Sequence, residues 1–120
     1  MPYINSTSFG EIVIDNKKYG QVIIVGDQIE ERDWEMLEKT FGTTHRLGDW
    51  EKEKLLEDDP QIIIVGTGQE GVLKVDSSFI DLLKKKGIEF YIVPTPQAVK
   101  IYNEKIQEKK KINALIHTTC

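Results

Sequence analysis

Short apolar runs alternate with amphipathic stretches along this chain, and their spacing predicts its strands and helices. Residues 9–14 and 19–25 flank a short polar turn, which predicts a β-hairpin. The four-residue run Ile62–Val65 is typical of a buried strand, and 72–75 alternates like a short one. The strands that we expect are 9–14, 19–25, 61–65, 72–75, 88–93 and 112–116.

Helix signals fall between these runs. Acidic residues and a following Pro60 favour a helix at 49–56. A second helix is expected from Ser77 or Ser78, as N-cap, to the lysines before Gly87. A third should begin with Thr95 as N-cap and end at the lysine run 109–111. The segment Glu30–Phe41 has helical spacing but no clear cap, and it stays ambiguous.

This order of elements predicts a mixed α/β (α+β) fold. Strand–helix–strand connections are right-handed and tend to make their strands parallel. The carboxyl ends of strands 61–65 and 89–93 should therefore lie side by side. That arrangement brings Gly66-Thr67-Gly68 close to Thr95, at the edge where open α/β sheets usually bind ligands.

The glycine turn allows two interpretations. Residues 66–71 spell G-x-G-x-x-G, but a strand-like segment follows where a dinucleotide fold has a helix, so we expect no nucleotide cofactor. The turn either provides a sharp exit from a buried strand or forms an anion cradle of N–H groups. The helix at Thr95 has no acid in its first turn. A bound anion, a partner's acidic side chain or Glu70 would offset its dipole, whereas a capped helix end needs no ligand. The candidate ligand-binding residues are Gly66, Thr67, Gly68, Thr95 and Asn103, the last of which could instead bond a loop backbone.

Composition limits the classes of function. The chain has 120 residues, which fits one domain at 1–120, and a net charge of −4, which argues against nucleic-acid binding. No apolar run is long enough for a membrane span, and residues 1–5 lack a signal-peptide pattern. The single Cys120 fits a reducing compartment, so we expect a cytoplasmic protein.

No catalytic set emerges from the sequence. His45, His117 and Cys120 are the only usual metal or nucleophile candidates, and three such residues without a known geometry predict no metal site. Trp34 and Trp50 lie in the least regular segment and are candidate interface residues, because tryptophan is enriched at protein interfaces.

Several motifs together resemble a known family. They are I-I-I-V-G-T-G at 62–68, P-T-P-Q-A-V at 94–99, Y-N at 102–103 and N-A-L-I-H-T-T-C at 113–120. In order and spacing they resemble a small uncharacterised family that includes the mitochondrial complex I assembly factor 3 proteins and the adipogenesis-associated protein. The resemblance implies three layers: a central mixed sheet, helices on one side, and a smaller N-terminal β layer on the other. It implies no catalytic residues.

Two functions therefore compete. The first is a non-enzymatic interaction or assembly module with an unidentified protein partner or a second copy of the chain, as a homodimer. The alternative is a protein, either a binder or an enzyme, that takes a small anion or metabolite at the glycine turn and Thr95. Neither reading involves nucleic acid or a membrane.

Overall fold

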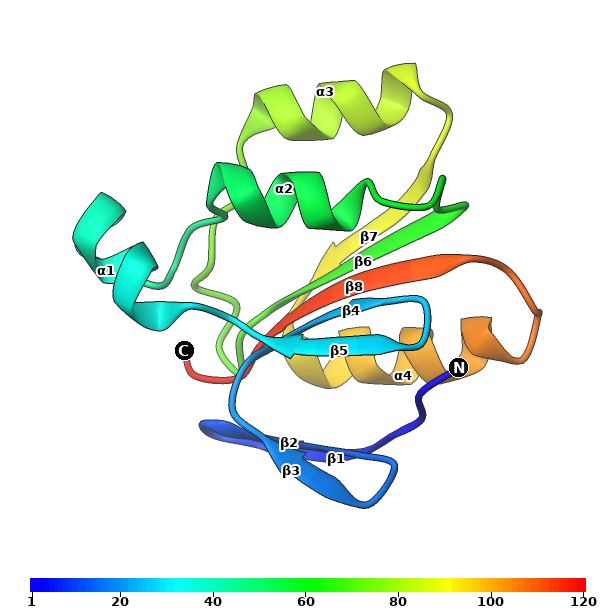
Figure 1. Ribbon diagram of the computed structural model, residues 1–120, viewed down its shortest axis with the longest axis horizontal. Coiled ribbons are helices and arrows are strands. Elements are labelled where there is room, and N and C mark those ends of the chain that lie inside the picture. The colour runs from blue at the N-terminus through cyan, green and yellow to red at the C-terminus, as the bar shows by residue number, and fades with distance from the viewer.

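Two sheets and four helices form the protein in a computed structural model that describes all residues, 1–120 (Figure 1). The small sheet has the order β1-β2-β3, and the main sheet has the order β5-β4-β8-β6-β7. The strands are β1 (Ile4–Ser8), β2 (Glu11–Ile14), β3 (Lys17–Tyr19), β4 (Val22–Val25), β5 (Gln28–Glu31), β6 (Ile62–Thr67), β7 (Glu89–Val93) and β8 (Ile112–His117). The helices are α1 (Trp34–Phe41), α2 (Asp49–Leu55), α3 (Ser77–Lys85) and α4 (Thr95–Ile106). The mixed α/β fold is therefore confirmed.

The core of the main sheet consists of β6 and β8, in which every residue is buried. Strand β6 is parallel to both β7 and β8, whereas β4 pairs antiparallel with β8. A strand covered on both faces needs an apolar run rather than an alternating pattern, which explains the sequence Ile62–Val65. The carboxyl ends of β6, β7 and β8 meet at one edge, here called the carboxyl edge, and their starts meet at the opposite, amino edge.

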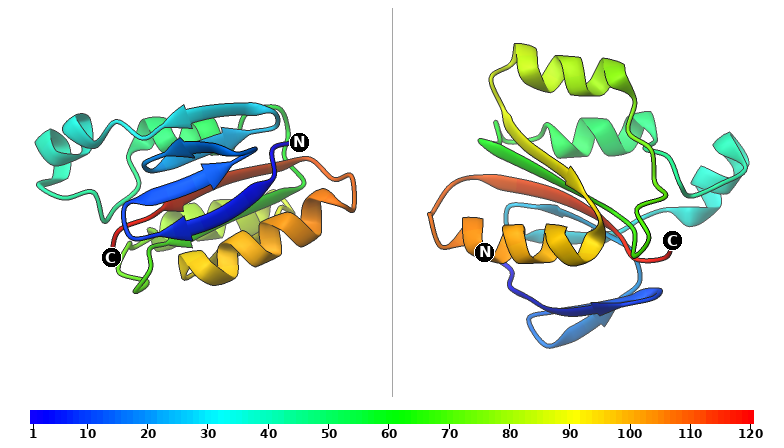
Figure 2. Two further views of the ribbon diagram at one scale, coloured as in Figure 1. Left: turned by 90° about the horizontal axis from the view of Figure 1, so that it is seen from below. Right: turned by 180° about the vertical axis from the view of Figure 1, so that it is seen from behind.

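The helices cover both faces of the main sheet, which corrects the expectation that they lie on one side. Helix α4 shares one apolar core with the small sheet, through Ala98 and Tyr102 packed with Ile12 and Ile14. Helices α2 and α3 cover the other face, where Leu55, Phe79 and Leu83 form a second core (Figure 2). The small sheet has only three short strands, so it covers part of its face and α4 covers the remainder.

The N-terminal half departs from the expected elements in two places. The return strand 19–25 is split, because β3 pairs with β2 in the small sheet while β4 crosses into the main sheet. The ambiguous segment 30–41 contains the end of strand β5 and all of helix α1, and Asp33 caps that helix by accepting the Met36 N–H at 3.0 Å. A side-chain cap was therefore present but was missed in the sequence.

Three further expectations change in detail. Residues 72–75 form no strand, and Lys74 makes only an isolated bridge with Arg46. Helix α3 begins after Asp76 rather than at a serine cap, and Thr95 lies inside α4 with Pro94 as its N-cap. None of the four helices has the length and apolar content that crossing a bilayer requires.

Tyr102 gives a test of the core beneath α4. Its side chain is fully buried, and its hydroxyl has no hydrogen-bond partner. Burial raises the pKa of this phenol above its usual value of 10, so the group stays neutral at ordinary pH. A buried hydroxyl without a partner destabilises the folded state.

We expect Tyr102→Phe to raise the free energy of unfolding by about 1 kcal/mol, as measured by urea denaturation. Tyr91→Phe is the matched control, because the Tyr91 hydroxyl donates to Glu89 Oε2 at 2.5 Å. The control should be neutral or slightly destabilising. A loss of stability in Tyr102→Phe would show that the hydroxyl has a partner in solution.

Candidate functional site

The structure brings the glycine turn and the start of α4 together, as the sequence predicted. The Gly68 N–H donates to Thr95 Oγ1 at 2.9 Å, and the Thr95 N–H donates to the Gly68 carbonyl at 2.9 Å. The Thr95 hydroxyl then donates to the His117 carbonyl at 2.5 Å. Thr95 is fully buried and joins the ends of β6 and β8 to α4. Its polar atoms are thus satisfied within the protein.

The N–H groups after the glycine turn bind the chain itself. Gln69 N–H donates to the Thr119 carbonyl at 2.7 Å, and the N–H groups of Glu70 and Val72 both donate to the main-chain oxygen of Cys120 at 3.0 Å. Residues 119–120 therefore already accept from these N–H groups, and the anion cradle stays a prediction. A ligand at this place would have to displace them.

Close packing explains why glycine occupies positions 66 and 68. A Cβ at Gly68 would lie 2.3 Å from the carbonyl carbon of Cys120, and the φ of +108° already disfavours other residues. A Cβ at Gly66 would lie 2.9 Å from Thr95 Oγ1. Both glycines are accounted for by close approach of neighbouring segments, and a ligand role for Gly66, Thr67, Gly68 and Thr95 stays a prediction.

Asn103 lies elsewhere, on the part of α4 that faces the small sheet. Its Oδ1 accepts the Ile4 N–H at 3.1 Å, and its Nδ2 donates to the Ile4 carbonyl at 2.8 Å. The Asn103 amide thus pairs with both main-chain polar groups of Ile4, as a residue of an adjacent strand would, and links β1 to α4. The structure therefore separates Asn103 from the glycine turn and gives its amide an internal partner.

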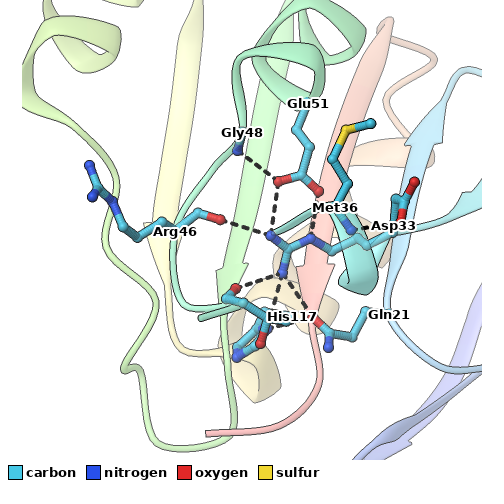
Figure 3. Close-up of polar contacts among 9 residues, drawn as sticks. Gln21, Asp33, Met36, Arg46, Gly48, Glu51 and His117 are labelled. Carbon is cyan, nitrogen blue, oxygen red and sulfur yellow. Dashed lines mark hydrogen bonds and ion pairs between the residues drawn. The ribbon is translucent and has the colours of Figure 1, made fainter. Parts of the chain in front are cut away.

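The most extensive polar cluster centres on Arg32, which the sequence analysis did not identify (Figure 3). The side chains of Arg32 and Glu51 are both completely buried. Arg32 Nε donates to Glu51 Oε2 at 2.7 Å, and Nη2 donates to Oε1 at 2.9 Å, which makes a bidentate ion pair. Glu51 Oε1 also accepts the Gly48 N–H at 3.0 Å, at the start of α2.

The remaining guanidinium hydrogens are also bonded. Nη2 donates to the Arg46 carbonyl at 2.9 Å, and Nη1 donates to Gln21 Oε1 at 2.8 Å and to the Thr44 carbonyl at 3.2 Å. A guanidinium has five N–H donors, and all five are used here. Arg32 therefore has no free donor for an anionic ligand while the cluster is intact.

His117 joins this cluster in one neutral form. Gln21 Oε1 accepts a hydrogen bond from Arg32 Nη1. The same oxygen lies 2.6 Å from His117 Nδ1, so Nδ1 must be the ring nitrogen that carries the proton and donates. His117 Nε2 then accepts from the Thr119 hydroxyl at 3.1 Å. Burial lowers the pKa of His117 from 6.5 to about 4, and the charge of Arg32 and then His45 add to this shift.

The candidate metal ligands do not converge. The rings of His45 and His117 meet edge to face with centroids 5.2 Å apart, and both ring nitrogens of His117 already have partners. No group of three or more His, Cys, Asp or Glu side chains is arranged to hold a metal ion.

A small hollow of about 250 Å³ lies beside the Arg32 cluster on the carboxyl edge. Trp34 stands at its rim with 60% of its surface exposed. Trp50 differs, because it is only half-exposed and its ring covers Gly48, where a Cβ would lie 2.6 Å from the ring. The hollow is lined by Gly10, Gly20, Gln21, Glu31, Arg32, Trp34, Thr118 and Thr119.

Removing the carboxylate of Glu51 tests the buried ion pair. Glu51→Ala leaves the Arg32 charge buried and uncompensated, which should cost about 3–5 kcal/mol in the free energy of unfolding. Glu51→Gln, which keeps one acceptor, should cost less and remains measurable if the alanine variant does not fold. Glu53→Gln, at an exposed position of the same helix, should change stability by less than about 0.5 kcal/mol. Equal effects at both positions would contradict this role.

The neutral state of His117 makes stability depend on pH. In the unfolded chain this imidazole binds a proton below about 6.5, whereas in the folded protein it does so only below about 4. Protonation therefore favours unfolding, and stability should rise by up to roughly 3 kcal/mol between pH 4 and 6.5 and then level off. Urea denaturation across this range should show the slope in the wild type and in His45→Gln, but not in His117→Gln. A slope that survives in His117→Gln would assign it to other groups.

Solved structures of three other proteins resemble this one over nearly the whole chain. The conserved hypothetical protein PH1505 from Pyrococcus horikoshii OT3 is 35% identical, covers 98% of each chain and superposes with a TM-score of 0.80. A protein named MT938 is 27% identical over 100% of both chains, with a TM-score of 0.79. A Mth938-like domain from Bordetella pertussis shares the fold at 14% identity, over 97% of this chain and 85% of that one, with a TM-score of 0.62.

A family model described as a protein of unknown function (DUF498/DUF598) matches residues 4–117. This match confirms the resemblance that the motifs at 62–68, 94–99 and 113–120 indicated. The model spans all but the first three and last three residues, and it includes the glycine turn, Arg32 and Glu51. The chain therefore belongs to the DUF498/DUF598 family of proteins of unknown function.

Proposed function

We propose that this protein is a non-enzymatic interaction or assembly module that binds a partner protein through the carboxyl edge. The observation that carries the proposal is the exposure of Trp34 at the rim of the hollow. Trp34, Met36 and Phe9 are 60%, 46% and 65% exposed, and together they are called the tryptophan surface here. Trp34 lines the hollow together with Gly10, the residue that follows Phe9 in the sequence.

The charge around the tryptophan surface favours a basic partner. Arg32 is buried and neutralised by Glu51, so it contributes little to the surface potential. The carboxylates of β5 and α1 are exposed, and only Glu30 has a cationic partner, Lys54 at 2.8 Å. A partner with lysine or arginine near an apolar contact would suit this surface, because cations also bind the face of tryptophan. The exposed acids are Glu30, Glu31, Asp33, Glu35 and Glu38.

The backbone beneath Trp34 is held in place before any partner binds. The Trp34 N–H donates to the Arg32 carbonyl at 3.1 Å, and Asp33 caps the helix that Trp34 begins. Arg32 itself is tied to α2 and β8 by its buried contacts. A residue on a fixed backbone loses less entropy on binding than one on a mobile backbone. This favours the interpretation of Trp34 as an interface residue rather than as an incidentally exposed side chain.

The alternative of a small-anion or metabolite site at the glycine turn has weaker support. Residues 119–120 occupy the N–H groups of that turn, and the polar atoms of Thr95 are bonded internally. The cytosol is the compartment that we propose, because the single Cys120 has no partner for an internal disulfide.

The proposal can be tested by comparing what tagged variants capture from extracts of the source cells. Trp34→Ala should reduce the capture of a specific partner by roughly 30-fold or more, as expected for a tryptophan that anchors an interface. Raising the salt concentration should weaken the remaining binding, because opposite charges contribute. Quantitative mass spectrometry measures both effects.

Leu82→Ala is the matched control, since Leu82 is also a partly exposed apolar residue but lies on α3. It should capture the same partner as the wild type. Sedimentation of the purified protein identifies self-association, in which case the partner is a second copy. If the wild type and Trp34→Ala capture identical sets of proteins and sediment alike, the proposal is wrong.

A further inference from the structure

The largest cavity of the protein lies at the amino edge, on the side of the main sheet opposite the tryptophan surface. It has a volume of about 630 Å³ and lies among three connections that are far apart in sequence. These are the β4–β5 turn at Gly26 and Asp27, the α2–β6 loop at Asp58, and the α4–β8 loop at 107–111 (Figure 1, right). A volume of this size is typical of sites for small organic ligands.

Asn113 holds these connections in position. It is 3% exposed, and its Oδ1 accepts the Gly26 N–H at 3.2 Å. Its Nδ2 donates to the carbonyls of Leu55 and Glu57 at 2.9 and 2.8 Å. The amide thus ties the β4–β5 turn and the α2–β6 loop to the start of β8. A cavity whose walls are joined by buried hydrogen bonds is preformed, so a ligand need not order them.

Three residues that line this cavity have left-handed backbone. Gly26, Asp58 and Lys109 have φ angles of +59°, +60° and +57°. Glycine and aspartate adopt this conformation readily, so it is unfavourable only at Lys109.

The lining combines an apolar floor with a cationic rim. Met1 and Ile106 provide accessible apolar surface, and Lys109, Lys110 and Lys111 provide three positive charges. Lys110 lies 3.6 Å from the carboxylate of Glu108, and Lys111 Nζ donates only to the Asp58 carbonyl at 3.3 Å. Lys109 makes no ion pair.

Two carboxylates also line the cavity, but they leave the cations in excess. Asp27 is paired with the amino group of Met1 at 3.3 Å, so its charge is already compensated. Asp58 is the only other acid, against three lysines. The balance favours an anionic group on any ligand.

We propose that this cavity binds a small organic anion with an apolar body, of the class of medium-chain monocarboxylates. The apolar body contacts Met1 and Ile106, where each buried methylene strengthens binding. The carboxylate meets the lysine rim, and Lys109 is its first partner because that ammonium has no internal ion pair. The site is separate from the tryptophan surface, so it does not depend on the proposed interaction function.

An NMR titration of the amide groups tests this site with three probes of equal chain length at constant ionic strength. Octanoate should shift the amides of residues 26–27, 58 and 106–113 in a saturable way. Octanol, which lacks the charge, should bind at least five-fold more weakly, and octylammonium should not saturate. Equal affinity for octanoate and octanol, or shifts spread over other surfaces, would overturn the proposal.

A pair of variants tests the lysines. Lys109→Asn/Lys110→Gln removes two charges, and asparagine tolerates the left-handed backbone at position 109. It should weaken octanoate binding about ten-fold and leave octanol binding unchanged. The matched control is Lys84→Gln/Lys85→Gln at the end of α3, which should bind octanoate as the wild type does. Thermal melting shows that each variant is folded, and unchanged octanoate binding by the folded Lys109→Asn/Lys110→Gln variant would refute the role of the lysine rim.

Discussion

One buried guanidinium joins more of this protein than any other side chain. Arg32 follows β5, and its five donors reach Glu51 of α2, Gln21 before β4, and the carbonyls of Thr44 and Arg46. The loop between α1 and α2 has little regular structure of its own, so these bonds replace the ladder that a strand would provide. A charge that is excluded from water must be paired inside the protein. Glu51 supplies that pairing from the first turn of α2, so the requirement determines where α2 begins.

The same cluster explains the chemistry of the carboxyl edge. The charge of Arg32 is neutralised internally, and His117 is kept in its uncharged form beside it. The Thr95 hydroxyl and the N–H groups of Gln69, Glu70 and Val72 donate to the end of β8 and to the residues after it. The edge where α/β proteins commonly bind ligands is therefore filled by the protein's own chain. What remains exposed there is apolar and acidic, and the proposed interaction with a partner protein rests on that composition.

The two edges of the main sheet thus differ in kind. At the carboxyl edge, close packing requires Gly66 and Gly68, and the hollow beside Trp34 is small. At the amino edge, three loops leave a larger cavity that Asn113 keeps open. Position alone would have placed a small-molecule site at the first edge, whereas the packing favours the second. The relatives compared above share the fold, and a shared fold does not by itself assign a function.

The sequence alone determined the features that depend on local pattern. The run Ile62–Val65, the glycine stop after α3 and the Thr95-Pro96 helix start are local signals, and they located β6, β7, β8, α3 and α4 and their parallel order. The tertiary structure decided what depends on distant partners: the Arg32–Glu51 pair, the split of 19–25 between two sheets, the position of α4, and the occupation of the glycine turn by residues 119–120. An isolated arginine and glutamate carry no periodicity that links them across 19 positions. The face of the main sheet that α4 covers depends on how much of that face the small sheet leaves open. The area left open is a property of the assembled layers and not of any single segment.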